Sequence, residues 1–284
     1  MSEPQTTPPP MAKERYSSRT RWLTNLALIL VTFFFGAPFL WIIASAFDKG
    51  KAQYVPWPSQ PTFENFQTLW NDDSIRTALK NSLFISITVM VLATVLASLA
   101  GFALSRLRFR QKTNVVYAVL LLYAIPIAAT MVAIYDLADR LDLIDTYRGI
   151  ILAQTAIALP FLIWLNKGFY DGLPRYLDEA AAIDGRSTWR GWLEILLPLS
   201  KTGLAITAGF AFTAAWSEVL LVSILIYQAD KTTLAYQFFS SAQKFSDTQV
   251  TAALGVLYLL PVVILFLILR RWMVRSLITS TRGL

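Results

Sequence analysis

The 284-residue sequence contains no cysteine and no histidine. Disulfides and cysteine-based metal sites are therefore excluded, and so is any mechanism that needs an imidazole base. Charge is scarce as well, because only 15% of the residues are charged, whereas a soluble domain has about a quarter. Hydrophobic residues make up 55% of the chain and gather in runs of roughly 20, the length that crosses a bilayer core of about 30 Å. We therefore expect a polytopic membrane protein with one membrane domain.

Six apolar runs are candidate membrane helices. They predict an all-α membrane domain over residues 22–275, with spans at residues 23–47, 79–104, 115–134, 149–166, 203–227 and 250–269. The first run ends near "ASA", which resembles a signal-peptide cleavage site, but its roughly 25 uncharged residues exceed a signal h-region of about 7–15, so we expect a retained helix. Prolines inside four of the runs predict helix kinks at Pro38, Pro126, Pro160 and Pro261.

Basic residues are unevenly distributed between the connecting segments. With both termini in the cytoplasm, 17 of the 25 Lys and Arg residues fall on the cytoplasmic side, and 10 of the 18 acidic residues fall on the outer loops. This is the positive-inside signal of membrane proteins, and it accounts for the net charge of +7 without a nucleic-acid partner. Residues 1–21, which are polar and Pro-rich, are expected to form a disordered cytoplasmic tail, and residues 276–284 a second tail.

Two of the apolar runs carry small residues at every fourth position. Such stripes let helix backbones approach closely in a membrane, either within the chain or against a partner subunit, and a substrate path can follow the same stripe. The positions are Ala93, Ala97 and Gly101 in one run, and Ala205, Gly209, Thr213 and Ser217 in the other.

Residues 168–202 form a polar cytoplasmic segment between two apolar runs. Good helix formers at residues 176–183 predict a first helix, and Gly185 is a natural helix stop. Ser187 predicts the cap of a second helix that Pro198 ends, with one apolar face made of Trp189, Trp192, Leu193 and Leu196. The pattern leaves two possibilities open: an amphipathic connector lying on the membrane, or an element that docks into a cytosolic protein.

The same segment carries a resemblance to a known family. Glu179-Ala180-Ala181, Asp184-Gly185 and "LPL" at 197–199 resemble the EAA loop of the permease subunits of bacterial ABC importers. Further segments resemble the carbohydrate-uptake, maltose-type branch of these permeases: "PTFENFQTLW" (61–70), "NSLFIS" (81–86), "GFALSRLRF" (101–109) and "AWSEVLL" (215–221). The resemblance extends from about residue 30 to the C-terminus and implies a type I importer permease fold, multi-pass in the bacterial inner membrane.

The resemblance also implies partners and a mechanism. The EAA loop of that family sits in a cleft of a cytosolic ATPase, whose ATP-driven closure moves the permease helices from an inward-facing to an outward-facing arrangement. The implied partners are a dimer of ATPase subunits, a second homologous permease and an extracytoplasmic solute-binding protein. The implied coupling residues are Glu179, Ala180, Ala181, Asp184, Gly185, Trp189, Leu193 and Pro198.

Catalytic chemistry is not expected in this chain. It has no Gly-rich Walker loop followed by Lys-Ser/Thr, so we expect a non-catalytic subunit that binds no cofactor and no metal, with ATP and Mg held by the ATPase. A membrane enzyme would need a catalytic set, and the spans offer neither histidine, cysteine nor an acidic cluster.

Glu218 is the only ionisable residue well inside a predicted span. An intramembrane charge is costly unless it faces the bundle or a cavity, so Glu218 is either a substrate-pathway residue or a structural group bonded to a neighbouring helix. Trp216, two positions earlier, offers a ring that can stack on a sugar. The other polar candidates for the pathway, each of which can instead form an interhelical hydrogen bond, are Ser217, Tyr123, Gln154 and Asn81.

We therefore expect the permease subunit of an ABC importer, forming with a second permease the path for a sugar that a binding protein delivers. One alternative is an ABC importer permease for a non-sugar solute. Another is an ion-coupled secondary transporter, which usually shows internal repeats and paired intramembrane charges. Neither feature is evident in this sequence.

Overall fold

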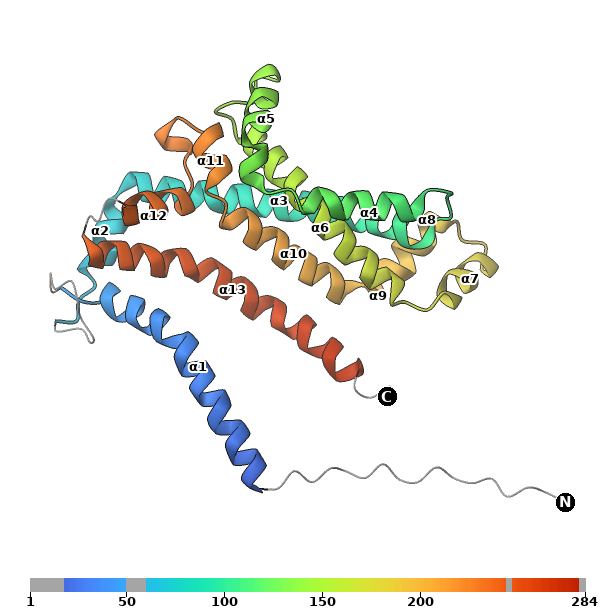
Figure 1. Ribbon diagram of the computed structural model, residues 1–284, viewed down its shortest axis with the longest axis horizontal. Helices are drawn as coiled ribbons and strands as arrows, with labels where there is room; N and C mark the ends of the chain where they lie inside the picture. The colour runs from blue at the N-terminus through green and yellow to red at the C-terminus, as the bar shows by residue number, and fades with distance from the viewer. Residues whose placement is uncertain (1–17, 50–59, 244–246, 281–284) are drawn as a thin grey trace.

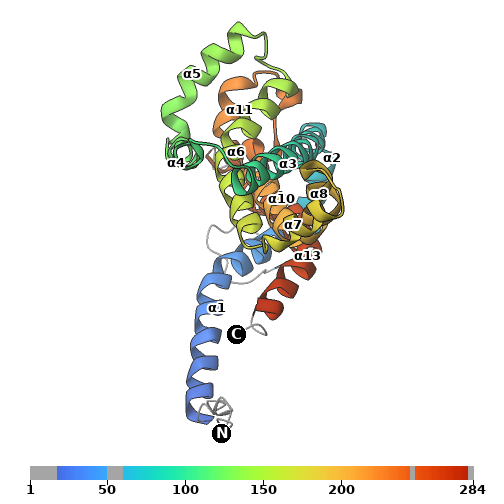
Figure 2. The same ribbon diagram turned by 90° about the vertical axis from the view of Figure 1, so that its right-hand side faces the viewer.

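The computed structural model describes residues 18–49, 60–243 and 247–280, and within these ranges the chain is helical, with one isolated bridge between Asp48 and Pro61. Five longer helices set its shape (Figures 1 and 2): α1 (Ser18–Ala46), α3 (Asp73–Arg106), α6 (Tyr147–Asp171), α10 (Lys201–Trp216) and α13 (Thr248–Ser280). Shorter elements join them: α2 (Glu64–Asn71), α4 (Lys112–Tyr123), α5 (Ile127–Arg140), α7 (Tyr176–Ile183), α8 (Thr188–Gly191), the π-helical turn η1 (Trp192–Leu196), α9 (Leu197–Leu199), α11 (Leu220–Leu225), the 3₁₀ turn η2 (Ala229–Lys231) and α12 (Leu234–Gln243).

The described helices confirm the predicted all-α membrane fold. Four are long and apolar enough to cross a bilayer, at residues 22–46, 73–106, 147–171 and 248–270. Two bent helix pairs bring the possible spans to six: α4 with α5, at 96°, and the segment 188–199 with α10, at 78°. The first pair corresponds to the predicted span 115–134. In the second pair only α10 belongs to the predicted span 203–227, because residues 188–199 lie in the segment predicted to be cytoplasmic.

The bend between α4 and α5 lies at Pro126. Where a kink was predicted, the helix breaks: α4 ends at Tyr123, and Pro126 has an extended backbone (φ −61°, ψ 131°) before α5 begins at Ile127. A proline has no N–H to donate and pushes the preceding residue out of the helical region. The other three prolines, Pro38, Pro160 and Pro261, lie inside continuous helices.

The predicted span 203–227 breaks after Trp216. The Ser217 hydroxyl donates to the carbonyl of Thr213 at 2.8 Å, and the Glu218 carboxylate accepts from the N–H of Leu221 at 2.9 Å. Polar side chains that bond to nearby backbone groups compete with helix continuation. Two short side chain–backbone bonds therefore accompany the end of α10 and the start of α11.

The helix ends also differ from the predicted boundaries. α1 begins at Ser18, so the last residues of the predicted tail 1–21 are helical, whereas residues 1–17 lie outside the described ranges. α13 continues to Ser280, beyond the predicted domain end at 275, and residues 281–284 of the predicted C-terminal tail are not described. α3 starts at Asp73, where the Asp72 carboxylate caps it by accepting from the N–H of Ser74.

The centre of the molecule is the packing of α3 against α6 and α10. The predicted stripe on α3 is buried at Ala93, Ala97 and Gly101. A Cβ on Gly101 would lie 2.7 Å from the Cβ of Asn166, so only glycine allows α3 and α6 to approach this closely. The stripe on α3 therefore packs within the chain.

The stripe on α10 is used differently. Its buried small residues are Gly203, Thr207, Ala211 and Ala215. The predicted positions lie two residues further on: Ala205 and Gly209 are partly buried, whereas Thr213 and Ser217 are exposed. Two residues correspond to about 200° around a helix, so α10 carries small residues on two nearly opposite faces. Contact with α3 and α6 decides which face is buried in this chain.

α1 diverges from the other helices (Figures 1 and 2). The C-terminal end of α1 packs on α13. Most of the described apolar side chains of α1 are exposed, among them Phe33, Phe34 and Phe35. Figure 1 also shows α7 and α8 at one end of the long axis and α2 and α12 at the other.

Candidate functional site

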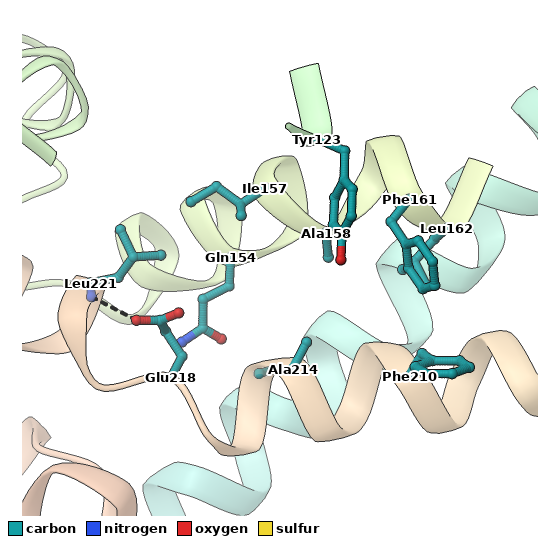
Figure 3. A pocket seen from close by; sticks show the side chains of 11 residues that line it. Tyr123, Gln154, Ile157, Ala158, Phe161, Leu162, Phe210, Ala214, Glu218 and Leu221 are labelled. Carbon is teal, nitrogen blue, oxygen red and sulfur yellow. Dashed lines mark hydrogen bonds between the residues drawn. The ribbon is translucent and has the colours of Figure 1, made fainter. Parts of the chain in front are cut away.

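A cavity of about 240 Å³ opens between α4, α6, α10 and α11 (Figure 3). We call it the α6–α10 pocket. Its lining brings together three of the six predicted pathway residues, Tyr123, Gln154 and Glu218. Apolar side chains complete the wall: Ile157, Ala158, Phe161, Leu162, Phe210, Ala214, Ala215 and Leu221. Ligand pockets in proteins are built in this way, from an apolar wall and a few polar groups.

Gln154 and Glu218 form the polar end of the pocket, where Figure 3 shows their side chains directed toward one another. Gln154 is only 4% exposed, and among the described residues its side-chain oxygen and nitrogen have no hydrogen-bond partner. Leaving a buried amide without a partner costs free energy, so such a group is a candidate for meeting a ligand or water. Glu218 uses one carboxylate oxygen to cap α11 and lies on the pocket wall.

Aromatic rings form the other end. The rings of Tyr123 and Phe161 stack with centroids 5.2 Å apart, and Phe210 meets Phe161 edge to face at 5.4 Å. Figure 3 shows these three side chains on one side of the cavity, away from Glu218. Rings of this kind present flat apolar faces, which suit the C–H face of a pyranose, while the amide and carboxylate can bond to hydroxyl groups.

The other three predicted pathway residues lie elsewhere. Asn81 donates to the carbonyls of Asp230 and Thr232 and accepts from the Tyr147 hydroxyl, so its amide is engaged on both sides. Trp216 is 1% exposed, donates to the carbonyl of Tyr258 at 3.0 Å and stacks on Phe212. The hydroxyl of Ser217 is bonded within α10.

Phe161 and Phe210 were missed by the sequence interpretation, although a spacing signal existed. Phe161 follows Gln154 by seven positions, which places both on one face of α6, and Ala158 lies between them. Phe210 and Ala214 precede Glu218 at spacings of eight and four. A search for helix faces that contain the polar candidates would therefore have found both aromatic residues.

The second candidate site is the segment 176–199, which we call the α7–α9 hairpin. Its turn agrees with the sequence prediction, because Gly185 has φ +74°, a conformation that favours glycine, and the N–H of Arg186 bonds to the carbonyl of Ala181 at 2.9 Å. Ser187 caps α8 by accepting from the N–H of Arg190. Ala181 packs against Gly191, where an added Cβ would lie 3.3 Å away.

The apolar residues of the second arm do not share one face, contrary to the prediction. Trp192 and Leu196 are 5% and 2% exposed and pack with Phe102 and Tyr170, whereas Trp189 and Leu193 are 54% and 47% exposed. The π-helical turn Trp192–Leu196 changes the residue spacing, so the four side chains divide between two faces.

Pro198 lies at the end of the second arm, as predicted: the helical segment 188–199 ends one residue later, at Leu199. The chain then bends by 78° at Ser200 before α10 begins at Lys201. Of the eight predicted coupling residues, Ala181 is buried, and the others are exposed: Glu179, Ala180, Asp184, Gly185, Trp189, Leu193 and Pro198.

Comparisons with known proteins agree with this architecture. A family model described as "Binding-protein-dependent transport system inner membrane component" matches residues 93–279, which contain both the pocket and the hairpin. The maltodextrin transport system permease protein MdxG of Bacillus subtilis is 32% identical over 267 residues, 92% of this chain and 94% of MdxG. The diacetylchitobiose uptake system permease protein NgcG of Streptomyces coelicolor is 28% identical over 269 residues, 92% of this chain and 89% of NgcG.

A solved structure has the same fold. In the crystal structure of a bacterial ABC transporter involved in the import of the acidic polysaccharide alginate, one chain matches with a TM-score of 0.76 and 19% sequence identity. The match covers 90% of this chain and 98% of that chain.

Proposed function

Because the chain belongs to the family of binding-protein-dependent transport system inner membrane components, we propose that it is the permease subunit of an ATP-binding-cassette importer for carbohydrates. The observation that carries this proposal is the family match over residues 93–279, joined by relatives named for maltodextrin and diacetylchitobiose transport. The protein is a multi-pass component of the inner membrane, and its apolar helices agree with that location.

The partners follow from this role. A binding-protein-dependent system includes a separate solute-binding protein, which delivers the carbohydrate. A second permease subunit completes the path, and a pair of ATPase subunits supplies the energy. This chain is then a non-catalytic subunit, and ATP with Mg is bound by the ATPase.

The exposed face of the α7–α9 hairpin is the proposed contact with the ATPase. The Glu179 carboxylate is exposed and takes part in none of the ion pairs between described residues, so it is available to a basic group of the ATPase. Asp184 adds a second exposed carboxylate, and Trp189 and Leu193 add exposed apolar surface. Exposed aromatic residues beside charged groups are typical of protein interfaces.

The α6–α10 pocket is the proposed carbohydrate contact of this chain. Its aromatic rings would stack on a sugar face, and Gln154 and Glu218 would bond to sugar hydroxyls. The buried amide of Gln154 supports this role, because it has no partner among the described residues.

The proposed orientation places the hairpin in the cytoplasm. Charge counting predicts this orientation, and the arrangement in Figure 1 supports it, since α7 and α8 lie at the end of the molecule opposite to α2 and α12. The two ends would then face opposite sides of the membrane, with the outer end toward the binding protein.

Co-purification tests the docking proposal. We expect the full chain, extracted from membranes in mild detergent, to carry an ATPase and a second permease. A variant with Glu179→Ala and Gly185→Val should lose the ATPase, because a charged contact is removed and the turn at φ +74° disfavours valine. The matched control is Glu64→Ala with Gly172→Ala, an exposed acid elsewhere and a glycine at φ −71°. Retention of the ATPase by the first variant would reject the docking assignment.

A further inference from the structure

Tyr170 joins three elements at the end of the molecule that carries the hairpin. It lies in the last turn of α6 and is 0% exposed. Its hydroxyl lies 2.7 Å from the Ser98 hydroxyl on α3 and accepts from the indole N–H of Trp192 in the hairpin at 3.0 Å. Its ring meets that of Phe102 edge to face, with centroids 5.9 Å apart. One buried side chain therefore contacts α3 and the second arm of the hairpin.

A second attachment holds the first arm. Arg106, at the end of α3, forms an ion pair with Asp178 of α7, with Nε and Oδ2 3.0 Å apart; the contact is one of charge, because its angle is not that of a hydrogen bond. Arg106 also donates to the carbonyl of Leu173 at 2.8 Å, and its side chain is only 6% exposed. A buried guanidinium is strongly destabilising when unpaired, so this contact favours one position of α7 against α3.

Both arms of the hairpin are thus fastened to the same helix. The attachments lie on the inner face of the hairpin, while its residues Glu179, Trp189 and Leu193 remain exposed on the outer face. A connector hinged at its two ends would let a bound partner move it without moving α3. These contacts instead make the hairpin and the adjoining ends of α3 and α6 one packed unit.

We propose that Tyr170 is a positioning residue that fastens the α7–α9 hairpin to α3 and α6, with Arg106–Asp178 as the second fastening, so that displacement of the hairpin moves these helices as one body. The inference rests on the proposed function, because the docked ATPase supplies the displacement. The Tyr170 hydroxyl makes the attachment to the hairpin, because it accepts the hydrogen bond from Trp192. A phenylalanine would fill the same volume but would leave the N–H of Trp192 without its acceptor in a buried site.

Distance measurement between paired spin labels tests the proposal. The chain has no native cysteine, so cysteines at Arg190 and Leu96 would be labelled specifically on the hairpin and on α3. Both positions are exposed. The labelled chain is purified with its ATPase and second permease and measured without nucleotide and after trapping with Mg-ATP and vanadate. With the native Tyr170, we expect the same narrow distance distribution in both states.

Tyr170→Phe should add a second population of distances in the trapped state. Loss of a buried hydrogen bond that leaves its donor unpaired shifts an equilibrium by about tenfold, so the detached population should grow by about that factor. Tyr117→Phe is the matched control, since Tyr117 is 62% exposed on α4, and its distribution should not change. Asp178→Asn, which removes the charge of the second fastening, should change the distances in the same direction. It replaces Tyr170→Phe as the test variant if Tyr170→Phe does not fold.

The outcomes separate the two proposals. An unchanged distribution in Tyr170→Phe, or in Asp178→Asn where that variant serves, with the ATPase bound would overturn the fastening role of these contacts. Absence of the ATPase from the native preparation would contradict the proposed function instead.

Discussion

The Cβ atom of Asn166 lies so close to Gly101 that a Cβ on this glycine would come within 2.7 Å of it. The backbone nitrogen of Lys167 would be 2.9 Å away, so the contact cannot be relieved by a side-chain rotation alone. This contact sets the distance between α3 and α6. α6 forms one wall of the pocket, and both helices contact the hairpin.

Replacement of Gly101 by alanine should therefore destabilise the protein. Overpacking of a tight contact costs about 1–3 kcal/mol, and we expect a lower thermal midpoint of the purified chain in detergent. Gly168→Ala is the matched control in α6: nothing lies within 4 Å of the added Cβ, and alanine in a helix is favoured over glycine by about 0.5–1 kcal/mol. Equal midpoints for the two variants would contradict the close approach of α3 and α6.

Glu218→Gln should lower carbohydrate uptake while leaving assembly intact. The amide oxygen of glutamine can still accept from the N–H of Leu221, so the start of α11 is kept. A hydrogen bond to a charged acceptor is stronger than a neutral one by about 1 kcal/mol, which corresponds to about a fivefold loss of uptake. The measurement is uptake by cells that contain equal amounts of the two proteins, and unchanged uptake would remove Glu218 from the pathway.

Gln154→Leu is the companion variant. Because the amide of Gln154 has no partner among the described residues, leucine should leave the thermal midpoint unchanged or raise it, and uptake should still fall. A variant that loses stability but transports normally would show that Gln154 is structural.

The contacts of Asp145, in the loop before α6, predict that the stability of the protein depends on pH. Its carboxylate accepts from the N–H groups of Tyr227 and Gln228, each at 3.1 Å, and Lys231 lies beside it. Desolvation alone would raise the pKa of Asp145, but the N–H donors of Gln228 and Tyr227, together with Lys231, outweigh it and hold the pKa below its ordinary value. The contact therefore stabilises the fold above the pKa of the unfolded chain, about 3.9, and this stabilisation is lost as pH falls through the lowered folded pKa.

Asp145→Asn isolates this effect. Asparagine tolerates the φ of 57° and keeps an acceptor for both N–H groups, but it does not titrate. We expect the difference in thermal midpoint between the native protein and this variant to be largest near neutral pH and to vanish in acid. A difference that stays constant with pH would argue against a role for the charge.

The sequence predicted the helices well where a long apolar run is enough to identify a membrane helix, as in α3, α6 and α13. It also predicted the turn at Gly185 and the cap at Ser187, because these depend on one residue and its neighbours. It did not predict the breaks at Pro126 and after Trp216. A proline inside an apolar run is compatible with a continuous helix, as at Pro160, and with a full break, as at Pro126.

The candidate site was predicted only in part. Tyr123, Gln154 and Glu218 come from three separate segments, and only the packing of α4, α6 and α10 brings them together. The small residues of α10 occupy two faces, so spacing alone could not identify the buried one. The sequence of the hairpin's second arm fits a regular α-helical spacing, which the π-helical turn at Trp192–Leu196 changes.

Uptake by purified components tests whether this chain is the permease of an ATP-driven carbohydrate importer. The chain is reconstituted into liposomes with its second permease and its ATPase, and a labelled carbohydrate is supplied on its binding protein. We predict uptake that requires both ATP on the ATPase side and the binding protein, and that persists when a protonophore collapses the proton gradient. Uptake that continues without the ATPase and stops when the gradient is collapsed would instead identify an ion-coupled transporter.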